Sequence, residues 1–262
     1  MKTLVYVFIA VTLLASCKSD DETAPVQNFG THFPSIEDSF WNYNNTSSQG
    51  ASRDSLYIVS SSIINDEATV TLGLGGAAEG FMTNLLSSGT LTTSGSKLLL
   101  NGVLSAPIDG FPDVTIPITN MVIYDLSASA PETMSSEGGR LEEVVSDIPI
   151  VIDYVISSNH ILTVSDEGAN GTIYYPKTNI VVNLAISAQI VFGGVTLDIP
   201  ILAAQDVIVS ENLFESEVGL TSSDVSINYQ LEDLSGLPIE LPIPSEGSEE
   251  AFQDLDTYMI EN

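Results

Sequence analysis

Few side chains in this sequence are of the types that carry nucleophilic or acid–base chemistry. The chain of 262 residues has one cysteine, Cys17, and two histidines, His32 and His160. A Ser-His-Asp site would have to use His160, but the sequence has no Gly-x-Ser-x-Gly motif. Zinc ligands are also missing, because there is no His-Glu-x-x-His motif and no cysteine cluster. We therefore expect no catalytic residue, no metal site and no cofactor, and we interpret His160 as an ordinary strand or turn residue.

Carboxylates are abundant, but their spacing does not define a site. Paired acids are the catalytic groups of glycosidases, and this chain has 35 acidic residues, with neighbours at Glu142-Glu143 and at Glu249-Glu250. Most such pairs on an acidic surface are simply solvated. Residues 166–171 only distantly resemble a calcium loop and are better interpreted as a hairpin turn. We expect the chain not to be an enzyme, although acidic pairs keep that class open.

The N-terminus gives Cys17 a specific chemistry. Lys2 precedes an apolar run over residues 4–14, which is too short to cross a bilayer as a helix of about 20 residues. The run ends in Leu14-Ala15-Ser16-Cys17. This segment resembles the lipobox of bacterial lipoprotein precursors, in which the thiol takes a diacylglyceryl group as a thioether. The resemblance implies a signal peptide over residues 1–16, cleavage between Ser16 and Cys17, and lipid on Cys17.

An ordinary signal peptide with an incidental cysteine is the alternative. It is the weaker one, because Cys17 is the only cysteine and stands where a lipobox requires it. Lipoprotein cysteines carry two or three acyl chains, which anchor a protein far more durably than a single chain does. The membrane is therefore an expected partner, reached through the N-terminal lipid.

The residues after Cys17 indicate which bacterial membrane the lipid would enter. Lys18 is followed by Ser19 and then by three acids, Asp20, Asp21 and Glu22. A lysine followed by acids resembles the export signal of surface lipoproteins in Bacteroidetes, and the aspartate of the usual inner-membrane retention signal is absent. The resemblance implies anchoring in the outer membrane, with exposure at the cell surface. The alternative is that residues 17–31 are only a solvated, flexible tether, since they have no hydrophobic period.

Net charge excludes one class of partner. The formal charge is −29 at pH 7, and Lys177 is the last basic residue in the chain. Such a surface repels phosphate backbones, so we expect no nucleic-acid binding. Anionic lipid headgroups are repelled as well, which leaves the lipid as the membrane contact. With a single cysteine the domain has no internal disulfide, so its stability must come from its hydrophobic core.

Alternation of apolar and polar residues dominates the rest of the chain. Residues 225–231 alternate cleanly, and residues 179–192 do so over a length typical of a strand that curves across a barrel. Pro117, Pro149 and Pro200 interrupt strand-like runs, which places these runs at edges, bulges or strand starts. Further strands are predicted over residues 54–64, 67–74, 97–108, 114–126, 148–157, 160–165, 171–176 and 195–209.

Helical periodicity is nearly absent. The best candidate covers residues 249–259, and a weaker one covers residues 81–86. We therefore predict a single all-β domain over residues 32–262, built as a curved antiparallel sheet or an open barrel. A β-sandwich is the alternative.

The sequence also contains an internal similarity. Residues 89–118 align with residues 171–201, and both segments run into an Ile-Pro-Ile. A duplicated β unit would explain the similarity. The alternative is that valine-rich strands resemble one another through composition alone.

Two short motifs carry a family resemblance. Residues 33–43, Phe-Pro-Ser-Ile-Glu-Asp-Ser-Phe-Trp-Asn-Tyr, resemble the opening F-P-L-x-x-G-x-x-W-x-Y of many uncharacterised flavobacterial-type Bacteroidetes surface lipoproteins, with Ser35 for leucine and Asp38 for glycine. Residues 214–220 resemble their Y-A-x-G-V-G-L-V segment. The resemblance implies a curved sheet like that of periplasmic lipoprotein carriers, and it implies no activity. Trp41 and Tyr43 could stack on a sugar, but their place at a strand start favours a core or lid position.

Two classes of function remain. The first is a non-catalytic binding module of the cell envelope, for an apolar ligand, a glycan or a protein. The second is a structural or assembly component of the outer membrane without a small ligand. An interior lined by apolar residues around an empty cavity would favour the first class, and an interior filled by its own side chains would favour the second.

Overall fold

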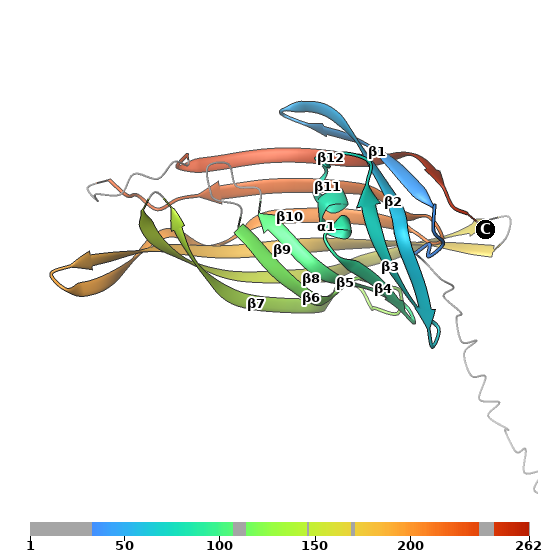
Figure 1. The fold of residues 1–262 in the computed structure, drawn as a ribbon, viewed down its shortest axis with the longest axis horizontal. Helices are drawn as coiled ribbons and strands as arrows, with labels where there is room; N and C mark the ends of the chain where they lie inside the picture. Colours follow the sequence, from blue (N-terminus) through green and yellow to red (C-terminus); the bar gives the residue numbers. More distant parts are fainter. Residues whose placement is uncertain (1–32, 107–113, 146, 169–170, 236–243, 262) are drawn as a thin grey trace, which may run out of the picture.

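The computed structural model describes residues 33–106, 114–145, 147–168, 171–235 and 244–261. These residues form one twelve-stranded antiparallel sheet and one short helix, α1 (Phe81–Ser87) (Figure 1). The strands are β1 (Phe40–Ser47), β2 (Gly50–Ile64), β3 (Glu67–Leu74), β4 (Thr90–Ser94), β5 (Lys97–Ala106), β6 (Val114–Asp125), β7 (Glu132–Val145), β8 (Ile148–Gly168), β9 (Gly171–Phe192), β10 (Val195–Glu215), β11 (Gly219–Gln230) and β12 (Glu246–Met259). No helix in these ranges is long and apolar enough to span a membrane.

The sheet is built from two sequential halves. β1 to β6 pair in chain order, β7 to β12 do the same, and β1 pairs with β12 to join the halves. This order leaves β6 and β7 at the two edges, and the sheet curves until these edges lie close together, so that it forms a nearly closed barrel. The predicted all-β antiparallel fold is therefore confirmed as an open barrel. The β-sandwich alternative is wrong, because the strands form one sheet.

Side chains bridge the two edges where the main-chain ladder stops. The Val122 N–H of β6 donates to Ser135 Oγ of β7 over 3.1 Å, and the Thr119 N–H donates to a carboxylate oxygen of Glu137 over 3.1 Å. Ser135 Oγ also lies 2.8 Å from Ser158 Oγ of β8. An unpaired strand edge exposes main-chain groups that invite aggregation. Here β7 covers part of the β6 edge with side-chain acceptors.

The interior of the barrel is packed with apolar side chains. Strand alternation places every second residue of β9 inside, as the sequence predicts, and none of these five is more than 3% exposed: Ile180, Val182, Leu184, Ile186 and Ala188. Tyr124 of β6 meets Phe214 of β10 across this interior, with ring centroids 5.2 Å apart. The middle of the barrel is therefore filled by its own side chains.

Of the two helix predictions, the favoured one is wrong and the weaker one is confirmed. The favoured segment, residues 249–259, is wrong as a helix, because it forms most of β12 between β1 and β11. The apolar residues that gave it helical spacing do not share a face, since Phe252 and Met259 are exposed while Leu255 packs against the core. The weaker segment is α1, which buries Met82, Leu85 and Leu86. Cross-strand pairing outweighs local periodicity here.

The three prolines lie where the sequence predicts. Pro117 is on β6, an edge strand. Pro149 is the second residue of β8. Pro200 lies at a register shift between β9 and β10. Each position avoids the loss of a ladder hydrogen bond that a proline inside a regular central strand would cause.

The segments of the internal similarity have different structures. Residues 90–106 form the β4–β5 hairpin, which turns at Gly95 with a φ of 61°. Residues 171–192 instead form the single long strand β9. Duplication of a β unit therefore stays a prediction about the sequence, and these two stretches are not equivalent in the fold.

The seam between β6 and β7 can be tested at Ser135. Ser135→Ala removes the acceptor of the buried Val122 N–H, so we expect it to lower the free energy of unfolding by about 1–3 kcal/mol in urea denaturation. Hydrogen exchange at the Val122 amide should accelerate. The matched control is Ser136→Ala, at an exposed neighbour on β7, with an expected change within about 0.5 kcal/mol. Equal effects of both substitutions would contradict this account of the seam.

Candidate functional site

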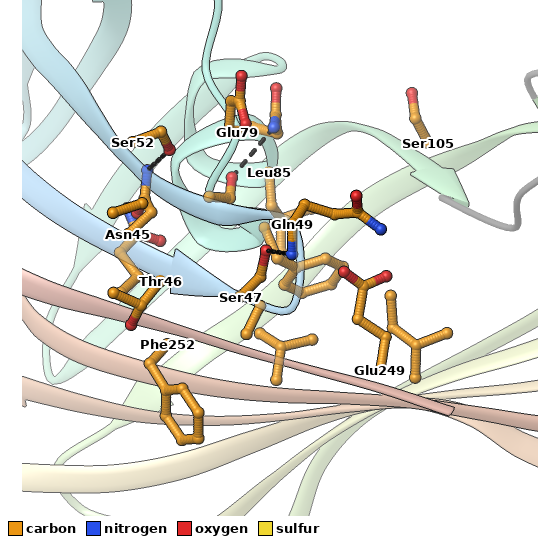
Figure 2. A pocket seen from close by; sticks show the side chains of 18 of the residues that line it. Asn45, Thr46, Ser47, Gln49, Ser52, Glu79, Leu85, Ser105, Glu249 and Phe252 are labelled. Carbon is orange, nitrogen blue, oxygen red and sulfur yellow. Dashed lines mark hydrogen bonds between the residues drawn. The ribbon is translucent and has the colours of Figure 1, made fainter. Parts of the chain in front are cut away.

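A cleft of about 460 Å³ lies beside α1 and the β1–β2 hairpin (Figure 2). Its walls come from the β1–β2 hairpin, from the segment that leads into α1, from the last residues of β5, and from β11 and β12. Five apolar side chains form much of the lining: Phe81, Leu85, Leu104, Val225 and Ile227. The volume lies within the range of small-molecule sites, about 300–1,000 Å³. We take this cleft as the candidate site.

The β12 residues that line the cleft come mainly from one face of the strand, with Phe252 of the opposite face also in the lining. Glu249, Ala251 and Gln253 share the inward face of β12, and all three line the cleft. Glu250 is exposed on the opposite face. The adjacent acids Glu249 and Glu250, which the sequence suggests are both solvated, therefore have different environments. Glu249 is half-buried beside its cross-strand partner Ile227.

Two amide side chains meet at the cleft. Asn45 of β1 is the cross-strand partner of Gln253 of β12, and they are 8% and 3% exposed. Asn45 Nδ2 donates to Ser52 Oγ over 3.3 Å, which Figure 2 marks, and Gln253 Nε2 donates to Thr83 Oγ1. Among the described residues, the carbonyl oxygens Asn45 Oδ1 and Gln253 Oε1 have no hydrogen-bond donor. Buried acceptors without a donor are costly, and they mark places where a ligand or water can bind.

These amides belong to a polar row that crosses six strands inside the barrel. The row follows the registers of β8, β9, β10, β11, β12 and β1, through His160, Thr178, Asn212, Ser223, Gln253 and Asn45. All six residues are buried. In the described part of the chain five buried side-chain polar atoms lack a partner, and four of them are in this row. Most of the unsatisfied buried side-chain polarity of the described residues therefore lies in this row, and the fifth atom is Tyr124 Oη.

His160 is a strand residue, as the sequence predicts, at the end of this row near the seam. It is 1% exposed, and its Nε2 lies 3.1 Å from Thr163 Oγ1. Burial lowers the pKa of His160, and the negative charges of Asp125 and Glu132 act in the opposite direction. The imidazole is therefore favoured in its neutral form. Among the described residues, the ring has the Thr163 hydroxyl as a hydrogen-bond partner but no carboxylate, so these contacts do not form a catalytic triad.

The short helix is held against the cleft by a buried acid. Asp54 of β2 is 2% exposed, and its carboxylate accepts the main-chain N–H groups of Glu79 and Gly80 over 3.0 and 2.8 Å. A Cβ at Gly80 would lie 2.7 Å from the Gln253 side chain and 2.8 Å from Asp54 Oδ2. Glycine is required there by close approach, and this contact places α1 against Gln253.

The aromatic residues of the N-terminal motif are core residues. Trp41 Nε1 donates to the Val218 carbonyl over 2.6 Å, and Tyr43 Oη donates to the Leu220 carbonyl over 3.1 Å. Trp41 and Tyr43 are each 1% exposed, so they offer no platform for a sugar. Gly219 lies between these carbonyls with a φ of 106°. The two motifs that resemble one family therefore contact each other directly.

One substitution within the motif has a conformational explanation. Asp38 stands where the family pattern has glycine, and its φ is 68°, in the left-handed region that glycine adopts most easily. Aspartate is one of the residues that tolerates this region better than most. The turn before β1 therefore keeps the conformation for which a glycine is suited.

Most of the remaining predicted site residues lie outside the part of the chain that the structure describes. Ser16, Cys17, Lys18, Asp20, Asp21 and Glu22 lie outside the described residues, and so does His32. Glu142 and Glu143 are exposed on β7. No group of three or more His, Cys, Asp or Glu in the described ranges is arranged to hold a metal ion.

Sequence reasoning missed Asn45, Asp54 and Gln253. One signal was available for Gln253, because it stands between Ala251 and Leu255 at an inward position of an alternating strand. A polar residue at an inward position of a strand is unusual. The prediction of a helix for this segment meant that inward and outward strand positions were not distinguished. Asn45 and Asp54 carried a comparable signal, because Asn45 follows Trp41 and Tyr43, and Asp54 precedes Leu56 and Ile58, at alternate positions of their strands.

The anchoring of α1 can be tested at Asp54. Asp54→Ala leaves the buried Gly80 N–H and the partly buried Glu79 N–H without their acceptor, so the free energy of unfolding should fall by about 1–3 kcal/mol. The Gly80 amide should lose protection in hydrogen exchange. Asp254→Ala, at an exposed position of β12, is the control and should change stability by less than about 0.5 kcal/mol. An unchanged Gly80 amide in the Asp54 variant would show that other contacts hold α1.

Comparisons with known proteins give one distant structural similarity. No family model and no curated protein matches the chain. Among solved structures, a "putative exported protein with YmcC-like fold" from Bacteroides fragilis matches with 10% sequence identity and a TM-score of 0.33. The match covers 87% of this chain and 99% of that one. A similarity at this level does not establish a shared function.

Proposed function

We propose that this chain is a lipid-anchored protein of the bacterial outer membrane whose β-barrel is a binding module for a small ligand. The cleft beside β12 carries the binding part of the proposal. It combines a suitable volume with an apolar wall, and the polar side chains that line it include Asn45, Gln253 and Glu249. Pockets of mostly apolar lining with a few convergent polar groups are the usual form of small-molecule sites.

The location rests on the N-terminal sequence. The lipobox over residues 14–17 supports lipidation of Cys17, and the acids after Lys18 support export to the cell surface. A barrel with a strongly acidic composition has little affinity of its own for anionic headgroups. The lipid would therefore hold the domain at the membrane while the cleft stays in water.

We also infer membership of the flavobacterial-type Bacteroidetes lipoprotein family that the two motifs resemble. The contact of Trp41 with the Val218 carbonyl supports this inference, because it gives both motifs one shared structural role. The left-handed conformation of Asp38, at the family's glycine position, supports it as well.

A structural role without a small ligand is the second candidate. The packed interior favours it, since apolar side chains of both halves of the sheet fill the middle of the barrel. The cleft is a separate space bordered by α1 and the β1–β2 hairpin, so a filled interior and a ligand site can coexist. The two candidates differ in whether the cleft has an occupant in the cell.

The anchor can be tested at Cys17. Cys17→Ala removes the thiol that would carry the lipid, so acyl labelling and partitioning into the detergent phase should both be lost. The matched control is Ser19→Ala, which should keep both properties because it leaves the lipobox intact. A Cys17 variant that still partitions like the unmodified sequence would refute the anchor.

Occupancy of the cleft can be tested by native mass spectrometry of the mature protein extracted from its own membranes. We expect a bound small molecule, and Ala251→Phe should remove it because the new ring fills the cleft. The control is Ala204→Phe, at an exposed position of β10, which should keep the molecule. Cooperative thermal unfolding of both variants shows that they fold. Repeated absence of a ligand from the unsubstituted protein would favour the structural role.

A further inference from the structure

We infer that the mature barrel rests on the lipid surface through an apolar patch on its outer face, formed by β2, the start of β1 and the end of β12. This inference rests on the proposed lipid anchor at Cys17 and adds to it the face of the barrel that meets the membrane. Three features lead to it: a concentration of exposed apolar side chains, uncharged surroundings, and the entry of the chain at the same place.

Exposed apolar side chains gather on this part of the surface. Fifteen large apolar residues are exposed in the described chain, and seven of them belong to the turn before β1, to β2 or to the last two residues of β12. These three segments lie side by side, because β1 pairs with both β2 and β12. Single exposed apolar residues are ordinary, but a contiguous group of them marks a surface for a partner protein or a membrane.

Four outward side chains form a continuous group, which we name the outer patch: Phe40, Tyr57, Val59 and Met259. Phe40, Tyr57 and Val59 alternate with core residues of their strands, so they point away from the interior. Phe40 is directly opposite Met259 on one side and Tyr57 on the other, and opposed Cβ atoms are about 4.5–5.5 Å apart. A Cβ built at Gly73 of β3 would lie 2.5 Å from Val59 Cγ2 and 2.8 Å from Tyr57 Cζ. Both side chains therefore lie over this glycine and extend the patch to β3.

The outer patch has uncharged surroundings in a strongly acidic protein. The next outward row of the same strands is Thr257, Asn42 and Ser55, which carry no charge. Arg53 lies beyond this row, and its charge is paired with Asp256. Such a surface avoids the cost of burying a charge at the lipid boundary, where amphipathic aromatic side chains such as tyrosine are enriched. The net charge of −29 opposes contact with anionic lipid, so the patch should favour zwitterionic lipid.

The described chain enters the barrel at the outer patch. The Ser39 carbonyl, in the turn before β1, accepts the Ile58 N–H over 3.0 Å, which holds this turn against β2 next to Val59. Phe33 follows Cys17 by 16 residues, which can span at most about 55 Å. A lipid on Cys17 would keep the patch within this reach of the bilayer, so even a weak apolar contact would orient the barrel.

A lipid surface fits the outer patch better than a second copy of the chain does. Association of two copies would bring two net charges of −29 together, whereas zwitterionic lipid carries no net charge. The bilayer is also the partner that the anchor would supply to every copy of the protein.

Spin labels at single introduced cysteines test this contact. Lipidation uses the thiol of Cys17, the only cysteine in the sequence, so Val59→Cys and Val155→Cys would each offer one reactive thiol. The two valines are 54% and 45% exposed, and β8, which carries Val155, lies six strands from β2 in the twelve-stranded order. In the lipidated protein on phosphatidylcholine vesicles, we expect the Val59 label to be severalfold less accessible to a water-soluble nickel complex than the Val155 label. Equal accessibility of the two labels would overturn the inference.

A charge placed in the outer patch gives a second readout without a label. Val59→Asp should lift the patch from the vesicle, so oxidation of the exposed Met259 by water-soluble chloramine-T should become severalfold faster. Val155→Asp makes the same change on the opposite side of the barrel and should leave this rate unaltered. Half-buried Met134 of β7 is the internal reference for exposure to the oxidant. The same Met259 rate in the unsubstituted protein and both variants would contradict the contact.

The outcomes separate failure of the inference from failure of the anchor. A second label on each cysteine variant, from a free Cys17 thiol, together with no vesicle binding would refute the anchor and this inference with it. Anchored protein with a water-exposed Val59 label would refute the patch contact alone. Dipolar broadening between Val59 labels on vesicles would identify a second copy as the occupant and would overturn the lipid contact.

Discussion

The antiparallel pairing of β1 with β12 is the contact on which the rest of the barrel depends. All the other strand pairings join strands that are neighbours in sequence, so without this contact the sheet would be two six-stranded meanders that meet through the side-chain hydrogen bonds between β6 and β7. The pairing joins residues from the two ends of the described chain, Phe40 with Met259 at one limit and Ser47 with Ala251 at the other. A contact of such sequence separation costs chain entropy before it gains any packing.

Aromatic side chains reinforce that junction. Trp41 and Tyr43 reach from β1 over β12 to carbonyls on either side of Gly219, so three strands are held together at one place. Phe33 stacks on Trp41 with ring centroids 5.6 Å apart, which extends the contact to the residues before β1. Burial of these rings supplies the apolar energy, and the two hydrogen bonds fix their orientation. The cleft lies along the same junction, because Asn45 and Gln253 are one of its cross-strand pairs.

Much of the fold was predictable from the sequence because each strand carries its own pattern. The alternation in residues 179–192 and 225–231 marks the inward faces of β9 and β11, and the prolines mark edges and irregularities. Local pattern failed at β12, where Phe252, Leu255 and Met259 have helical spacing but pairing with β1 and β11 imposes a strand. The candidate site was not predictable, since the polar row and the cleft exist only once the registers of distant strands are set.

The start of β1 and the mouth of the cleft lie apart from each other. Phe33 is packed on Trp41 at the start of β1. The cleft includes Ser47, Gln49 and Gly50 at the far end of the same strand. At about 3.4 Å per residue, the eight residues of β1 separate the two ends by about 25 Å. The described chain therefore enters the barrel away from the cleft, and none of the described residues before β1 lines the site.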